Sequence, residues 1–166
     1  MKLNIEVIAP RSGGDLAACR ALRHRVFVDE QSVPEQVERD ERDADCTHVL
    51  IRDEARAAIA TGRLLPEGRI GRMAVDPVWR RMGLGRIVLD LLQACALAAG
   101  RSRVSLHAQV SAVRFYTAAG YSRCGDDFVE AGILHTPMDR TLDPQSPGVD
   151  ALLAAAPTHL PQAPAA

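Results

Sequence analysis

The stretch Met73-Ala-Val-Asp-Pro-Val-Trp-Arg-Arg-Met-Gly-Leu-Gly-Arg86 decides the fold and points to a bound anion. An apolar strand ends at the Asp-Pro step, a turn with two glycines follows, and an amphipathic helix starts at once. Gly83 and Gly85 have no Cβ, so N–H groups at the start of that helix can approach an anion closely. Three nearby arginines add positive charge, and the segment therefore predicts a diphosphate site: Arg80, Arg81 and Arg86. It lacks the Lys-Ser/Thr ending of a nucleoside-triphosphate loop and the three glycines of a dinucleotide fold.

Hydrophobic periodicity on both sides of this segment predicts an α/β domain. Alternation indicates strands over residues 3–7, 47–52, 56–65, 69–76, 104–108, 121–124 and 133–142, and helical spacing indicates helices over residues 15–29, 84–95 and 111–119. A tight turn between the second and third strands predicts antiparallel pairing, whereas the helix between strands 69–76 and 104–108 predicts a parallel pair. The sequence therefore predicts a mixed α/β sheet.

Composition limits the classes to which the chain can belong. It has 166 residues, 47% hydrophobic and 25% charged, with a formal net charge of −1, which fits one globular domain and argues against a nucleic-acid partner. Its apolar runs are interrupted before membrane-spanning length and residues 1–10 do not resemble a secretory signal, so we expect a cytoplasmic protein without a membrane partner. The four separated cysteines predict free thiols rather than a metal site. Residues 143–166, rich in Pro and Ala, are expected to form a tail outside a domain of residues 1–142, with at most a short helix at 150–156.

Two motifs give the chain a family resemblance. Arg80-Arg81-Met82-Gly83-Leu84-Gly85 resembles the [Q/R]-x-x-G-x-[G/A] pyrophosphate loop of the GNAT family of N-acetyltransferases. Further along, Gln109-x-x-Ala112-x-x-Phe115-Tyr116-x-x-x-Gly120-Tyr121 is similar to the family's N-x-x-A-x-x-[FL]-Y-x-x-x-G-F signature, with Gln109 in place of Asn and Tyr121 in place of Phe. The two motifs at this separation make the resemblance specific.

Two further segments are similar to the ElaA-like branch of that family: Val26-Phe27-Val28-x-Glu30-Gln31-x-Val33-Pro34 and Glu130-Ala-Gly-Ile-Leu-His135-x-x-Met138. The resemblance covers residues 3–142 and implies the GNAT fold, a mixed and mostly antiparallel sheet with splayed parallel central strands and flanking helices. It also implies acetyl-CoA as the donor and the primary amine of a small molecule as the acceptor. Transfer would be direct, in a ternary complex, without a metal or a catalytic cysteine.

The resemblance assigns roles to the residues that would bind the donor. The backbone of Met73, Ala74 and Val75 would pair with the pantetheine arm, and an N–H group of that segment would stabilise the developing oxyanion. The loop and the second motif supply the other expected donor-binding residues: Arg80, Arg81, Met82, Gly83, Leu84, Gly85, Arg86, Gln109, Ala112 and Phe115.

Two residues are the candidates for proton transfer. Tyr116 is the candidate general acid, because a phenol can donate a proton to the departing CoA thiolate; the alternative is a core aromatic. His135 is the candidate general base, because an imidazole can accept the proton of an ammonium group near neutral pH. The alternative for His135 is a structural histidine, with another residue or water as the base.

An acidic stretch over residues 29–45 supplies the candidates for the acceptor site. If this stretch lines the acceptor site, its negative charge would attract a cationic amine. The alternative is a solvated loop. The residues considered for the acceptor site are Glu30, Gln31, Glu38, Asp40, Asp43 and His48. His107 and Gln109 share one face of their strand by parity.

Three alternatives stay open from the sequence. A non-catalytic acyl-CoA sensor could keep the diphosphate loop without turnover, and a protein or peptide N-acetyltransferase would use the same donor. The tail could also dock on a partner subunit, which would make a homodimer.

Overall fold

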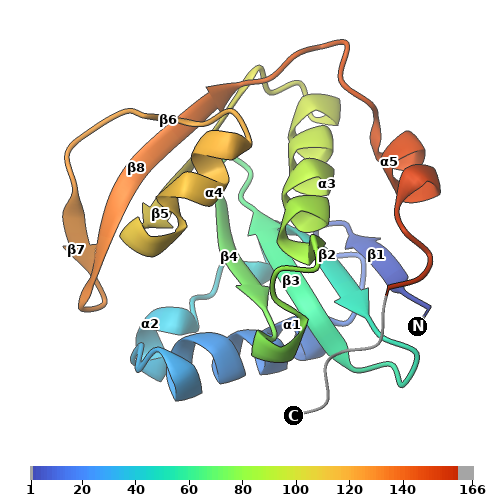
Figure 1. Cartoon of the computed structure of the whole chain (residues 1–166), viewed down its shortest axis with the longest axis horizontal. Helices are drawn as coiled ribbons and strands as arrows, with labels where there is room; N and C mark the ends of the chain where they lie inside the picture. The colour runs from blue at the N-terminus through green and yellow to red at the C-terminus, as the bar shows by residue number, and fades with distance from the viewer. Residues whose placement is uncertain (1, 161–166) are drawn as a thin grey trace.

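Two four-stranded sheets form the centre of the molecule in the computed structural model, which describes residues 2–160 (Figure 1). The strands are β1 (Asn4–Ile8), β2 (Thr47–Arg52), β3 (Ala58–Leu64), β4 (Ile70–Val75), β5 (Arg103–Gln109), β6 (Ser122–Arg123), β7 (Phe128–Glu130) and β8 (Ile133–Thr141). The first sheet is antiparallel in the order β1-β2-β3-β4. In the second sheet, β8 pairs antiparallel with β5, β6 and β7. Every predicted strand is present, and the short β7 is an addition.

The two sheets join where β4 begins and separate beyond that point. Arg69 forms an isolated parallel bridge with Ser105, and the Ser105 N–H donates to the Gly68 carbonyl at 3.2 Å. No other ladder joins β4 to β5 within residues 2–160, and Figure 1 shows the two strands diverging. This geometry confirms the predicted fold, a mostly antiparallel α/β structure whose parallel central strands splay apart.

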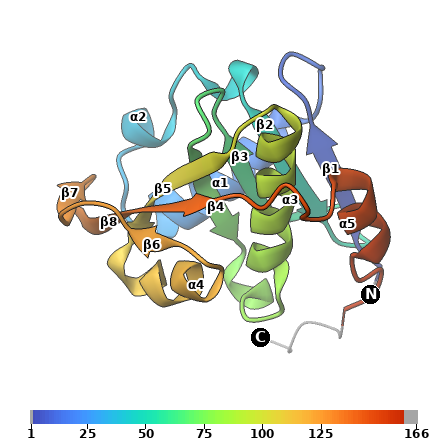
Figure 2. The ribbon, with the colours of Figure 1, turned by 90° about the horizontal axis from the view of Figure 1, so that it is seen from above.

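Helices cover both faces of the first sheet (Figure 2). On one face, α1 (Leu16–Arg23) continues into the π-helical turn η1 (His24–Glu30), so the helix predicted over residues 15–29 is present but changes its hydrogen-bond pattern halfway. On the other face lies α3 (Leu84–Ala98), and β3 between them is buried along its whole length. The shorter helices are α2 (Glu35–Glu38), η2 (Asp43–Asp45), η3 (Pro77–Trp79), η4 (Val110–Ala112), α4 (Val113–Ala118) and α5 (Val149–Ala155).

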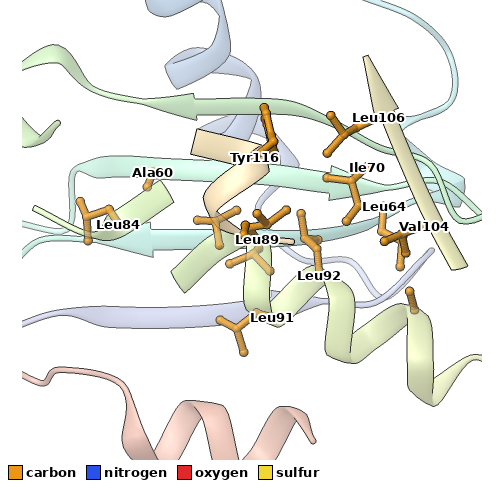
Figure 3. Close-up of a cluster of buried hydrophobic side chains, with 14 of the residues drawn as sticks. Ala60, Leu64, Ile70, Leu84, Leu89, Leu91, Leu92, Val104, Leu106 and Tyr116 are labelled. Carbon is orange, nitrogen blue, oxygen red and sulfur yellow. The ribbon is translucent and has the colours of Figure 1, made fainter. Parts of the chain in front are cut away.

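The main hydrophobic core ties α3 to both sheets (Figure 3). The apolar face of α3 supplies Leu84, Val88, Leu89, Leu91 and Leu92, and the sheets supply Leu64, Ile70, Val104 and Leu106. Tyr116 on α4 belongs to the same cluster. Close packing of this kind fixes side chains to within a fraction of an ångström, so the core sets the position of Tyr116 relative to β4 and β5.

The described part of the predicted tail packs on the domain. α5 confirms the expected short helix, and its Leu152 and Leu153 contact the main core. After it, His159 forms an antiparallel bridge with Lys2, and the Leu3 N–H donates to the Thr158 carbonyl at 3.0 Å. The tail therefore pairs with the chain just before β1, and α5 lies near that strand (Figure 2). Among residues 2–160, no helix is both long enough and apolar enough to cross a membrane.

Candidate active site

A bulge in β4 releases part of its backbone from the first sheet. Thr61 is paired with Ala74 and Arg63 with Gly71, so Arg72 and Met73 together oppose the single residue Gly62. Arg72 has a positive φ of 51°, which is rare for a residue with a side chain. Because β5 diverges on the other side, the β4 backbone near Met73 can pair with an extended ligand.

The diphosphate loop follows β4 and starts α3. Gly83 is the N-cap of α3 with φ +83°, and a Cβ placed there would have no atom within 4 Å. Leu84 and Gly85 begin the helix, so their N–H groups have no partner inside it, whereas the Arg86 N–H already donates to the Gly83 carbonyl at 3.0 Å. At Gly85 a Cβ would lie 3.6 Å from Phe115 and 3.7 Å from Val75, which places the loop between β4 and α4. An open cradle of helix-start amides fits a diphosphate in shape and charge.

The loop arginines differ in how they are paired. Arg80 binds Glu30 with two hydrogen bonds of 2.7 and 2.6 Å and also donates to the Val75 carbonyl. Arg86 binds Asp90 one helical turn away at 2.9 Å. Arg81 has no hydrogen-bond or ion-pair partner among residues 2–160 and is exposed, with φ +64°. Of the three, Arg81 alone keeps an uncompensated charge for a ligand.

The other predicted donor residues contribute through the backbone or by packing. Met82 is half-buried, whereas Leu84 and Ala74 belong to the core and would contribute only their main chains. Phe115 is 38% exposed beside the loop. Ala112 lines the cavity described next.

A cavity of about 360 Å³ occupies the space between the diverging strands. It brings together eight of the predicted residues: Gln31, Glu38, Asp40, Met73, Gln109, Ala112, Tyr116 and His135. Gln109 Nε2 donates to Gln31 Oε1 at 2.7 Å, so the end of η1 is tied to the end of β5 across this space. His107 and Gln109, which share one face of β5, both line the cavity.

Tyr116 presents a neutral phenol to the cavity. Burial raises the pKa of Tyr116 to about 12, so its proton is retained throughout the neutral range. Its ring packs edge-on against Phe115 and Tyr121 at centroid distances of 5.0 and 5.8 Å. No hydrogen bond in the described part of the chain occupies its hydroxyl. The phenol is therefore free to donate to a ligand.

His135 lines the other side of the cavity, and its ring is held by the backbone. Its Nδ1 lies 2.8 Å from the Ile133 carbonyl, which can only accept, so Nδ1 carries a proton. In the neutral imidazole, Nε2 is then the nitrogen with the lone pair. Phe128 stacks on the ring at 5.8 Å with an interplanar angle of 21° and fixes its plane. This orientation suits proton acceptance at Nε2.

The acidic stretch does not form the negative wall that the sequence suggests. Glu38 and Asp43 are buried and bind Arg23, and Asp43 also accepts from Arg63 at 2.8 Å. Arg63 donates to Asp40 at 2.7 Å, and this hydrogen bond lowers the pKa of Asp40. Glu38, Asp40 and Asp43 therefore form neither a negative wall of unpaired carboxylates nor a solvated loop, the two alternatives that the sequence suggested.

Two other acceptor-site predictions are also corrected. Glu30 lies outside the cavity lining and pairs with Arg80, whose hydrogen bonds lower the pKa of Glu30. His48 is 1% exposed, donates from Nε2 to the Asp43 carbonyl at 2.9 Å and lies outside the lining. Burial lowers the pKa of His48, so it is neutral and supports the loop that carries Asp43.

Several cavity residues carry chemistry that the sequence reading missed or left unassigned: Arg63, Arg69, Arg72, His107 and Glu130. Arg63, Arg69 and Arg72 come from β3, β4 and the turn between them, whose apolar pattern drew attention to the core instead. Glu130 comes from β7, which was not predicted.

Comparisons with known proteins agree on one family. The family model described as acetyltransferase (GNAT) domain matches residues 13–142. The N-acetyltransferase YjcF of Bacillus subtilis, itself uncharacterized, is 34% identical over 121 residues, covering 70% of this chain and 86% of YjcF. Among solved structures, an acyl-CoA N-acyltransferase from Pseudomonas aeruginosa is 30% identical with a TM-score of 0.75, covering 84% of this chain and 99% of that one. Escherichia coli ElaA is 26% identical with a TM-score of 0.74, covering 83% and 99%.

Proposed function

The chain belongs to the GNAT family of acetyltransferases, and we propose that it moves the acetyl group of acetyl-CoA to the primary amine of a small molecule. Membership makes it an acyltransferase that uses an acyl-CoA; the acetyl group, the small amine and direct transfer in a ternary complex are the proposal. One observation supports the proposal. The bulged strand β4, the neutral phenol of Tyr116 and the imidazole of His135 with its free Nε2 meet in a single cavity, next to the open start of α3.

Acetyl-CoA supplies the acetyl group as an activated thioester. The open amides after Gly83, together with Arg81, would bind its diphosphate, and the β4 backbone from Met73 to Val75 would pair with its pantetheine arm. An N–H group released by the bulge would donate to the acetyl oxygen, where negative charge develops during transfer.

Two side chains would then move protons. His135 Nε2 would take a proton from the acceptor ammonium, directly or through a water molecule, so that the amine can attack. The Tyr116 hydroxyl would donate to the departing sulfur, and its raised pKa keeps that proton available. No side chain need become acylated, because both substrates can lie in one cavity.

Turnover with a panel of primary amines tests this proposal. Purified protein, acetyl-CoA and each amine would be mixed, and the released CoA thiol measured with a colorimetric reagent. We expect thiol release together with an acetylated amine, and initial-rate plots that intersect as a ternary complex requires. Stabilisation by acetyl-CoA without turnover of any amine would instead favour the sensor, and turnover of peptides alone would favour a protein N-acetyltransferase.

A further inference from the structure

The arginines and carboxylates that line the cavity balance in number. They are Arg63, Arg69 and Arg72 against Glu38, Asp40 and Glu130. Arg23 and Asp43, which pair with these residues from behind the wall, add one charge of each sign. A ligand that enters this cavity therefore meets fixed charges of both signs rather than the negative wall that the acidic stretch suggested.

Arg69 is the arginine without a carboxylate partner. The other three arginines, Arg23, Arg63 and Arg72, bind the three carboxylates of the acidic stretch through contacts of 4.0 Å or less. Glu67, two residues before Arg69, is bound by Arg42 with two hydrogen bonds of 2.8 Å. Among residues 2–160 no ion pair to Arg69 is found, although its side chain is half-buried and lines the cavity.

Arg69 lies at the closed end of the cavity, away from the diphosphate loop. Its bridge to Ser105 is the point where β4 and β5 meet, whereas Gln109, four residues further along β5, is opposite His135. At about 3.3 Å per residue these two levels are roughly 13 Å apart, and the long side chain of Arg69 shortens the gap. Burial, and after it the charge of Arg69, lower the pKa of His107, which lies between the two levels.

We infer that the acceptor is an amine that also carries a carboxylate, and that Arg69 binds this carboxylate at the closed end of the cavity while the amine faces His135. The inference rests on the proposed function and names its substrate class. A guanidinium group presents a planar fork of N–H donors that matches a carboxylate. An acceptor carboxylate would pair with the charge of Arg69, which an alkylamine without an acid group cannot do.

The experiment compares acceptors that differ only in the carboxylate. The probes are ω-amino acids from glycine to 6-aminohexanoate, each matched to the n-alkylamine of the same carbon chain length, with kcat/KM taken from CoA release. We expect at least one ω-amino acid to exceed its alkylamine by about 10- to 100-fold, mainly through KM, because a charge-assisted hydrogen bond is lost in the alkylamine. The chain length of the best ω-amino acid measures the distance between the two ends.

Arginine variants then test the assignment to Arg69. Arg69→Gln should abolish the preference for the carboxylate, and Arg69→Lys should retain part of it. Arg39→Gln removes the same charge from an arginine that is 66% exposed outside the cavity, and should keep the full preference. Acetyl-CoA should raise the melting temperature of Arg69→Gln as it does for the wild type, which shows that the variant is folded and binds the donor.

Three outcomes would overturn the inference while the proposed function stands. The alkylamines could match the ω-amino acids in the wild-type protein, the preference could survive Arg69→Gln, or other amines could react while both series stay inert. A complete lack of turnover with every amine would instead remove the proposed function itself.

Discussion

Gly83→Ala tests the diphosphate loop with a magnitude that can be worked out from the backbone. Gly83 has φ +83°, and an added Cβ would have no atom within 4 Å, so the substitution costs conformational energy without a clash. A left-handed conformation costs an L-residue about 1–2 kcal/mol. At roughly 2–4 °C per kcal/mol for a chain of this size, the melting temperature of the free protein should fall by roughly 2–8 °C.

The donor should reveal a second and larger effect. At a concentration one hundred times its Kd, a ligand that binds only the native state adds about 2.7 kcal/mol, which corresponds to a rise of roughly 5–11 °C for the wild type. In Gly83→Ala the methyl group stands where the diphosphate would approach the helix start, so most of this rise should be lost. S-acetylpantetheine, which lacks the diphosphate, should stabilise either protein little.

Gly100→Ala is the matched control. Gly100 lies just beyond the other end of α3, has φ +79° and has equally open space around a Cβ. Its substitution should cost the same intrinsic stability and leave the rise with acetyl-CoA intact. Differential scanning fluorimetry of both variants, with and without acetyl-CoA, separates strain from binding. A full acetyl-CoA shift in Gly83→Ala would show that the donor is bound elsewhere.

Three further predictions concern the proton-transfer residues and the buried ion pairs. Tyr116→Phe should lower kcat by roughly 10²- to 10⁴-fold and leave the acetyl-CoA melting shift unchanged; normal turnover would return Tyr116 to a purely structural role. His135→Gln should reduce kcat/KM most at neutral pH, because an alkylamine with a pKa near ~10 is almost fully protonated there. The loss should shrink as pH rises, and a loss independent of pH would assign the base to another group. Burial raises the pKa of Asp43, but hydrogen bonds from Arg23 and Arg20 outweigh it and hold the pKa well below its usual range. Asp43 therefore stabilises the fold above the pKa of an unfolded carboxyl group, and this contribution is lost as pH falls through the folded-state pKa. Asp43→Asn should cost about 3–5 kcal/mol in urea unfolding at pH 7, with a smaller difference from the wild type in acid; an equal difference at both pH values would contradict the ion-pair explanation.

The parts of the site that the sequence predicted are those coded by short spacings. The two glycines after a strand define the start of α3, and the second motif places Tyr116 one turn into α4. His135 was predicted from the segment Glu130-Ala-Gly-Ile-Leu-His135-x-x-Met138, whose resemblance to the ElaA-like branch is carried by closely spaced residues at the start of β8. In each case the chemistry depends on neighbours within a few residues, which a single sequence displays.

The charge of the acceptor side could not be predicted in the same way. The partners of the acidic stretch come from α1, β3 and β4; Arg63, for example, is 20 residues from Asp43 along the chain. A run of carboxylates therefore looked like a negative surface, although folding brings arginines to it that pair with these carboxylates. Charge in a site is set by contacts between distant segments, and only the assembled fold displays them.

The bulge in β4 shows how packing in the core prepares the site before any substrate arrives. A Cβ on Gly62 would lie 2.6 Å from the sulfur of Met73 and 2.8 Å from Val88 of α3. The absence of a side chain at Gly62 thus lets α3 approach the sheet and lets Met73 fold toward β3. Arg72 takes up the extra residue with its positive φ, and its guanidinium is held by the carbonyls of Val37 and Glu38. Core packing around Gly62 and the hydrogen bonds of the guanidinium group together fix the strained residue Arg72. The free N–H groups beside the cavity are therefore a property of the folded chain itself.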